Sequence, residues 1–166
     1  LTWFFQGSNY LSAYGYGIMH RMHHAFADTP NDPHSPKYDE SLFKMMWKTK
    51  TIYSAITSKK MTVDARFTQH IPEWTAFDKF SRSLALKMFW GATFVAIYLF
   101  LPSEWLVLFF FPVQFLLSPI HGAIINWFAH KYGYRNFEVK DTSKNFLPFD
   151  FLMMGESYHN NHHKYG

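Results

Sequence analysis

The sequence predicts an all-α protein in which two membrane-spanning helices form a hairpin and a helical cap carries clustered histidines. Three observations lead to this prediction. Residues 84–101 form an apolar run whose single charged residue is Lys87, and residues 105–128 contain no Asp, Glu, Lys or Arg. Only the turn Pro102-Ser103-Glu104 separates the two runs. Seven of the ten histidines fall into short clusters on either side of this hairpin.

The length and charge pattern of the two runs favour a membrane hairpin. Each run is long enough to cross a hydrocarbon core of ~30 Å as a helix. All 16 Lys and Arg residues lie at or before residue 87 or after residue 130. The excess of positive charge in both flanks places them in the cytoplasm, so we expect a multi-pass membrane protein with its histidines on the cytoplasmic side. A soluble helical protein is the alternative, which the mean hydropathy of −0.18 favours.

The chain is predicted to be one domain, 1–166, and an internal fragment of a longer protein. It begins at Leu1 within an apolar aromatic run, and it ends three residues after a histidine pair. The region from Asp28 to Pro36 contains three prolines and predicts a loop. The expected segments are the end of a membrane helix with the first histidine cluster (1–24), a cytoplasmic region (25–83), two transmembrane helices (84–128) and a cytoplasmic region with the last histidine cluster (129–166).

Composition excludes several classes of protein and site. The chain is 48% hydrophobic and 21% aromatic, too apolar for a disordered protein. It has no cysteine, which excludes disulfides, thiolate-bound zinc, iron–sulfur clusters and thiol catalysis within the segment.

Two histidine triplets share one spacing. His20, His23 and His24 are related as i, i+3 and i+4, and the same spacing recurs at the other end of the chain. On a helix such a triplet occupies roughly 100° of one face, so three imidazoles can point into a common space. Asn126 and His130, spaced i and i+4, predict a third arm at the end of the second membrane helix. The second triplet consists of His159, His162 and His163.

Seven clustered imidazoles predict two metal ions, because one tetrahedral zinc needs fewer ligands. Nitrogen ligands suit iron, copper or zinc. The absence of carboxylates inside the triplets argues against a carboxylate-bridged di-iron bundle. Four nearby carboxylates either orient the imidazoles through their second ring nitrogen or cap loops and helices. They are Asp28, Asp32, Asp141 and Glu156. His34, His70 and His121 lie outside the pattern and are not expected to be ligands.

At this point the residues resemble a known family, the membrane fatty-acid (acyl-CoA or acyl-lipid) desaturases. The run His20-Arg21-Met22-His23-His24, followed by Asp32-Pro33-His34-Ser35-Pro36, is similar to the second histidine box of that family. The stretch Asn126 to Asn145 matches its region after the last membrane helix, and Gly155 to His163 resembles its third box. The family also has a first box, H-x-x-x-x-H, which has no counterpart before His20 and which we expect upstream of Leu1.

The resemblance implies an enzyme that inserts a cis double bond, of the delta-9 type, into a saturated acyl chain by means of O₂ and two electrons. It implies two iron ions, an acyl-CoA or lipid-linked substrate in the bilayer, and an electron donor such as cytochrome b5, a ferredoxin or a reductase. No protein nucleophile or general base is required, and no nucleic-acid partner is expected. The implied ligands are His20, His23, His24, His130, His159, His162 and His163, with Asn126 acting through a bound water.

Two other functions remain open on the sequence. A related membrane di-iron hydroxylase or monooxygenase would share the same histidines, although the stretch Asn126 to Asn145 and the sequence Asp32-Pro33-His34-Ser35-Pro36 favour the desaturase. A non-catalytic metal-binding membrane domain would bind metal without consuming O₂.

Overall fold

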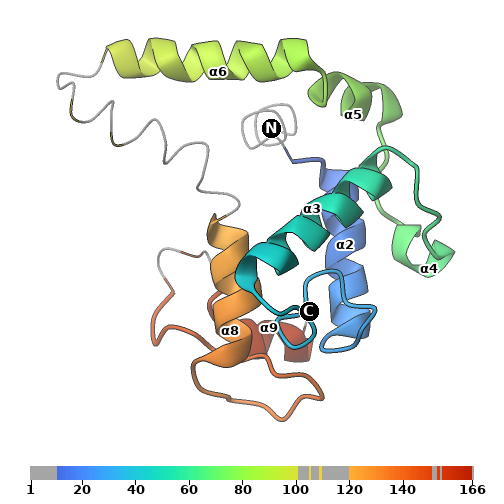
Figure 1. Ribbon diagram of the computed structural model, residues 1–166, viewed down its shortest axis with the longest axis vertical. Coiled ribbons are helices and arrows are strands. Elements are labelled where there is room, and N and C mark those ends of the chain that lie inside the picture. The colour runs from blue at the N-terminus through green and yellow to red at the C-terminus, as the bar shows by residue number, and fades with distance from the viewer. Residues whose placement is uncertain are drawn as a thin grey trace.

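The computed structural model describes residues 11–100, 105, 109, 120–150, 153 and 155–165. Every regular element within these ranges is a helix, and the β-bridges among them are isolated. This confirms the all-α prediction for the described part of the chain (Figure 1). In chain order the helices are α2 (Ala13–Phe26), α3 (Leu42–Thr57), α4 (Ala65–Thr68), α5 (Thr75–Ser81), α6 (Leu84–Leu99), the π-helical η1 (Ile124–Phe128), α8 (Ala129–Lys131) and α9 (His159–Tyr165).

Serine side chains determine where the three longest of these helices begin. In α2, α3 and α6 the residue before the first turn is a serine whose Oγ accepts the backbone N–H three residues ahead, at 3.2–3.3 Å. Such a cap satisfies one of the N–H groups that a helix start leaves without a partner. The three capping residues are Ser12, Ser41 and Ser83.

Helix α2 is the centre of the packed lobe, with α3 and α4 against it (Figure 1). Its inner side buries Ile18, Met19 and Met22 against Ile56 of α3 and Phe67 of α4. Gly15 allows the close approach of α2 and α3, because a Cβ there would overlap the Thr57 methyl group. The opposite side of α2 is left free to carry the first histidine triplet.

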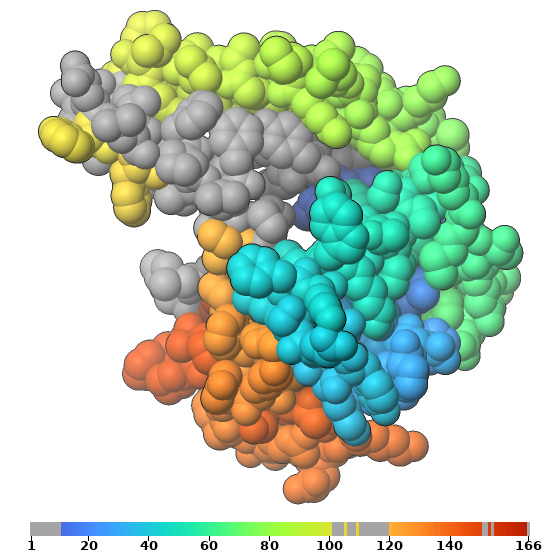
Figure 2. Space-filling view, in the orientation of Figure 1, coloured from blue at the N-terminus to red at the C-terminus, as the bar shows by residue number. Residues whose placement is uncertain are grey.

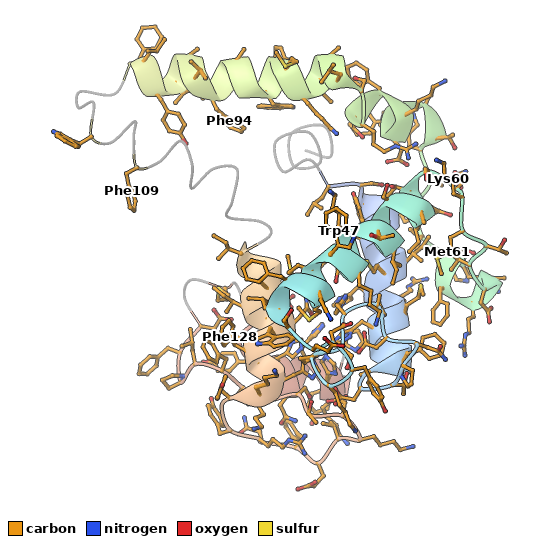
Figure 3. The ribbon with its side chains drawn as sticks, viewed as in Figure 1. Trp47, Lys60, Met61, Phe94, Phe109 and Phe128 are labelled. Carbon is orange, nitrogen blue, oxygen red and sulfur yellow. The ribbon has the colours of Figure 1, made fainter. Side chains whose placement is uncertain are left out.

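The predicted loop between α2 and α3 is observed. Residues 27–41 contain no helix and consist of turns and bends. The segment that follows the loop is helix α3. It buries Met45 completely and leaves Phe43 85% and Trp47 68% exposed. Trp47 projects from α3 in Figure 3.

The chain reverses direction after α8, and this reversal positions the helix that carries the second histidine triplet. Gly133 adopts φ +121°, and Tyr134 then pairs with Asn145, which pairs in turn with Tyr158. These two bridges bring residues 134, 145 and 158 side by side, although 24 positions separate the first from the last. The reversal therefore places α9 next to α8, as Figure 1 shows.

The predicted membrane hairpin stays a prediction, although its first apolar run is helical. The run 84–101 forms α6, 16 residues long, and most of the run 105–128 lies outside the described residues. Within the described ranges, no helix combines the length and the apolar character needed to span a bilayer. Helix α6 lies along one edge of the molecule in Figure 2 and exposes apolar side chains, among them Leu84 and Leu99 at 74% and 75%. Phe94 projects from it in Figure 3.

Replacing Gly133 by alanine should destabilise the fold. A Cβ there would overlap the Asn145 carbonyl oxygen, and φ +121° is a conformation that residues with a side chain rarely adopt. We expect Gly133→Ala to lower the free energy of unfolding by at least about 2 kcal/mol in chemical denaturation. Gly91→Ala in α6, where nothing lies within 4 Å, is the control and should not destabilise. Equal stability of the two variants would contradict the assigned role of Gly133.

Candidate metal centre

The two histidine triplets face each other from α2 and α9. Both lie on helices, as their spacing predicts. The structure refines the expectation that each triplet points into one common space. In each helix the residues at i and i+4 join one group, and the residue at i+3 joins another. Positions i+3 and i+4 lie about 100° apart around a helix, which explains the division.

The first group contains four imidazoles and is deeply buried. Its members are His23, His130, His159 and His163, each of which offers one ring nitrogen within 4.8 Å of those of the others. The Nε2 atoms of His23 and His163 are 3.2 Å apart, and those of His130 and His159 are 3.0 Å apart. Each side chain in this four-imidazole group is at most 3% exposed.

The second group contains three imidazoles whose Nε2 atoms form a nearly equilateral triangle. The separations are 3.2 Å between His20 and His24, 3.0 Å between His24 and His162, and 3.1 Å between His162 and His20. This three-imidazole group lies beside the four-imidazole group, since the rings of His24 and His163 are 4.7 Å apart at their centroids. All three of its residues are partly exposed.

Carboxylates fix the tautomer of two rings in the four-imidazole group. Asp32 Oδ1 lies 3.0 Å from His23 Nδ1, and Asp141 Oδ2 lies 2.9 Å from His163 Nδ1. A carboxylate can only accept, so both Nδ1 atoms carry the proton and both Nε2 atoms present bare lone pairs. Those lone pairs face each other at 3.2 Å, where no hydrogen bond between them is possible. A cation bound to both would turn this repulsion into attraction.

The nitrogen separations fit a bound metal ion. With metal–nitrogen bonds of about 2.1 Å, two imidazole nitrogens would be about 3.0 Å apart at a right angle and about 3.4 Å apart at a tetrahedral angle. The Nε2 pairs of both groups, at 3.0–3.2 Å, fall within this range. The two groups could therefore each hold a metal ion, and their donor set of imidazoles suits iron, copper or zinc.

Burial lowers the pKa of six imidazoles in the two groups and so favours the neutral form that binds metal. It lowers the pKa of His24 to about 3 and that of His130 to about 4, and neighbouring histidines add to both shifts. Burial is likewise the main cause of the lowered pKa of His20, His23, His159 and His162. Burial alone would raise the pKa of Asp141, but hydrogen bonds from His163 and Ser143 outweigh it and lower that pKa.

The four carboxylates singled out in the sequence take different positions. Asp32 and Asp141 contact imidazoles directly. Asp28 Oδ1 lies 4.0 Å from His130 Nδ1, beyond hydrogen-bond range, and its other oxygen accepts the N–H of Thr142. Thr142 Oγ1 lies 3.2 Å from that Nδ1, so it is the ring's near partner. Among the described contacts, none joins the Glu156 carboxylate to an imidazole by a hydrogen bond.

Asn126 and two of the remaining histidines stand apart from both groups. Asn126 lies in η1, and no hydrogen bond among the described residues joins its amide to an imidazole. A π-helical turn is a common feature of functional sites, and this one directly precedes α8 and His130. His70 and His121 join neither group, as the sequence predicts. The role of Asn126 stays a prediction.

Side-chain amides hold α9 in place, a feature that the sequence analysis missed. Asn145 Oδ1 accepts the backbone N–H of Asn160 at 3.0 Å, in the first turn of α9. Asn160 is fully buried; its Oδ1 accepts two backbone N–H groups, from residues 136 and 137, and its Nδ2 donates to the carbonyl of Phe137. Helical spacing places Asn160 beside His163 on the helix surface, at the edge of the histidine-bearing face, and so does not by itself indicate this role.

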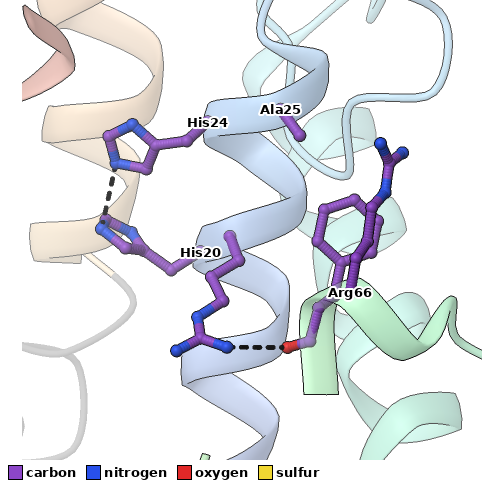
Figure 4. Close-up of a pocket in the computed structure, with 6 residues that line it drawn as sticks. His20, His24, Ala25 and Arg66 are labelled. Carbon is purple, nitrogen blue, oxygen red and sulfur yellow. Dashed lines mark hydrogen bonds between the residues drawn. The ribbon is translucent and has the colours of Figure 1, made fainter. Parts of the chain in front are cut away.

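A recess borders the three-imidazole group. Its volume is about 630 Å³, and its lining includes His20, His24 and the side chain of Arg66. Figure 4 shows His20 and His24 projecting from one side of α2, with Ala25 and Arg66 on the other. Arg21 donates to the carbonyl oxygens of Phe67 and Gln69 and so fastens α4 to α2. The three-imidazole group is thus the more accessible of the two.

Sequence comparison assigns the chain to a family. The sequence profile described as "Fatty acid desaturase" matches residues 1–166. The chain belongs to the fatty acid desaturase family. Delta-9 acyl-lipid desaturase 2 of Arabidopsis thaliana is 33% identical over 147 residues, which cover 88% of this chain and 45% of the relative.

Two further relatives of this chain are also named as desaturases or desaturase-like proteins. Delta-9 desaturase-like 4 protein of Arabidopsis thaliana is 31% identical, over 89% of this chain and 47% of the relative. The sn-1 stearoyl-lipid 9-desaturase of Synechocystis sp. is 28% identical, over 89% of this chain and 43% of the relative. The chain therefore spans less than half the length of these relatives. No solved structure matches it at a significant level.

Removing the charge behind an imidazole should weaken metal binding. In Asp141→Asn the partner of His163 Nδ1 becomes a neutral amide, so the ring loses a charge-assisted hydrogen bond. We expect Asp141→Asn and Asp32→Asn, made in the full-length protein, to raise the Kd for Co²⁺ about 10- to 100-fold in chelator competition. Glu156→Gln is the control and should change that Kd less than about threefold. A comparable loss in the control would count against specific orientation by the two aspartates.

The metal-free protein should lose stability in acid. The unfolded chain protonates histidine near pH 6.5, whereas His24 and His130 in the folded state protonate only near about 3 and 4. Between these values the unfolded state binds more protons, so the histidine contribution is fully present above about pH 6.5 and is lost as the pH falls toward 4. Urea unfolding at several pH values measures how the free energy of unfolding changes with pH. His130→Gln should flatten this dependence, and His70→Asn, outside both groups, should not.

Proposed function

We propose that this chain carries the di-iron centre of a membrane fatty-acyl desaturase of the delta-9 type. The observation that supports the proposal most strongly is the facing pair of bare Nε2 atoms of His23 and His163, each held by a carboxylate on its far side. The family assignment supports the reaction class, and the names of the relatives support the delta-9 position.

The proposed reaction removes two hydrogens from adjacent methylene groups. A saturated chain, O₂, two electrons and two protons give a cis alkene and two molecules of water. A pair of iron ions would supply the oxidising power that O₂ needs to attack an unactivated C–H bond, which zinc, lacking redox chemistry, would not. The chain's own contribution is to hold the ions and to exclude water from the buried group.

The proposed ligand sets follow the two groups. His23, His130, His159 and His163 would hold one ion, with Asn126 adding a water-mediated contact. His20, His24 and His162 would hold the other, together with the first histidine box that we expect upstream of Leu1. Asp32, Asp141 and Thr142 would orient three of the rings through their Nδ1 atoms.

We propose that α6 and the run 105–128 cross the membrane as a hairpin. Helix α6 exposes apolar side chains such as Leu84, Phe89 and Leu99, an arrangement that is unfavourable in water and favourable in lipid. The positive residues on both flanks support a cytoplasmic position for the histidine-bearing lobe.

A lipid-linked acyl chain is the substrate that we favour. Two of the relatives are named as acyl-lipid or stearoyl-lipid desaturases, which supports a glycerolipid over acyl-CoA as the carrier. The electrons would come from a separate donor such as cytochrome b5, a ferredoxin or a reductase.

Product analysis tests the proposed function. The full-length protein, expressed in a host without delta-9 desaturase activity, should convert saturated acyl lipids into cis-9 alkenes, detected by gas chromatography with mass spectrometry. His159→Ala should abolish the alkene, because it removes a nitrogen from the buried group. His70→Asn is the matched control and should retain activity. A hydroxylated product without alkene would instead identify a hydroxylase, and metal binding without O₂ consumption would identify a non-catalytic metal-binding protein.

A further inference from the structure

We propose that His34 is a positioning residue for His23, and that its ring holds the face of the His23 imidazole while Asp32 holds its edge. The proposal rests on the metal-binding part of the proposed function, not on the identity of the substrate. His34 belongs to the proline-containing loop between α2 and α3, and the sequence pattern of the triplets does not include it.

The loop that carries His34 is buried and hydrogen-bonded to neighbouring segments. Residues 32–36 are all buried, which is unusual for a connecting segment. Thr49 Oγ1 donates to the carbonyl oxygen of Met45 within α3 at 2.8 Å and makes a longer contact, at 3.3 Å, with the carbonyl oxygen of Pro33 in the loop. The carbonyl oxygen of Ser35 accepts the N–H of Asp39 at 3.2 Å. The loop is therefore tied to α3 on one side and to its own continuation on the other.

Two contacts from this loop meet the His23 ring from different directions. The ring of His34 lies 4.3 Å from that of His23 at the centroids and is tilted by 37°, so it covers a face. Asp32 Oδ1 accepts from His23 Nδ1 at 3.0 Å in the plane of the ring, and the same oxygen accepts the backbone N–H of His34 at 3.0 Å. One carboxylate oxygen thus ties the two histidines together.

The Nδ1 atom of His34 does not explain the burial of the side chain. The side chain is only 4% exposed, and its Nδ1 has no hydrogen-bond partner. A buried nitrogen without a partner lowers stability, so a hydrogen bond from this atom is not what the residue contributes. Its ring lies 4.3 Å from that of His23 at the centroids, tilted by 37°, and this contact limits rotation of the His23 ring about its Cβ–Cγ bond.

Metal spectroscopy of three variants of the full-length protein tests the proposal. The probe is Co²⁺, whose ligand-field absorption reports the geometry of its ligands. His34→Ala removes the ring and should raise the Kd for one Co²⁺ about tenfold and shift its absorption bands. His34→Phe keeps a planar ring without the nitrogens, so it should retain both the Kd and the band positions, with equal or higher thermal stability.

Thr49→Val is the control for a merely structural role. It removes the Oγ1 contact between α3 and the loop, together with the Oγ1 hydrogen bond within α3, without touching either ring. It should lower thermal stability and leave the Co²⁺ spectrum unchanged. A spectrum of His34→Ala identical to that of the parent protein would overturn the proposal.

Two further outcomes would also overturn it. Loss of a whole equivalent of Co²⁺ in both His34 variants would make His34 a metal ligand, in a site with His23 and Asp32. A shifted spectrum in His34→Phe at normal stability would show that the nitrogens, and not the ring face, are required. None of these readouts depends on desaturation, so a failure of the proposed activity would be distinguishable from a failure of this proposal.

Discussion

The hydrogen bonds from Asp32 and Asp141 to two imidazoles are the constraint on which the rest of the site depends. Each carboxylate accepts a hydrogen bond from the Nδ1–H of its histidine, so the proton stays on Nδ1 and the Nε2 lone pair is bare. Without these bonds the Nε2 atoms of His23 and His163, 3.2 Å apart, could share a proton as an ordinary hydrogen bond. With them, the pair is complementary only to a cation. The loops that carry the two aspartates therefore determine the chemistry as much as the histidine-bearing helices do.

The division of each triplet makes the two proposed metal positions unequal. The four-imidazole group is buried and backed by carboxylates, whereas the three-imidazole group borders the recess beside Arg66 and has no hydrogen bond to a carboxylate among the described residues. A negative charge behind an imidazole makes the ring a stronger donor. The buried position should therefore bind its ion more tightly, and the accessible position is the better placed to meet a small molecule such as O₂.

The sequence could predict the helices of the site but not the way in which their side chains divide. Spacing alone indicates that His20, His23 and His24 share a helical face, and α2 has this form. It does not indicate that His34 would fold back from a loop onto His23, or that Thr142 would reach His130, because both contacts depend on chain reversals. The hairpin was predicted from composition, and much of its second helix lies outside the described residues, so it stays a prediction.

Asn160 of α9 shows why an amide holds this helix, whereas carboxylates contact the imidazoles. Asn160 Oδ1 accepts two backbone N–H groups, which a carboxylate would do equally well. Its Nδ2, however, donates to the carbonyl oxygen of Phe137, where a carboxylate would be repelled. Neutral amides thus position the helix, and the negative charge stays behind the rings that benefit from it.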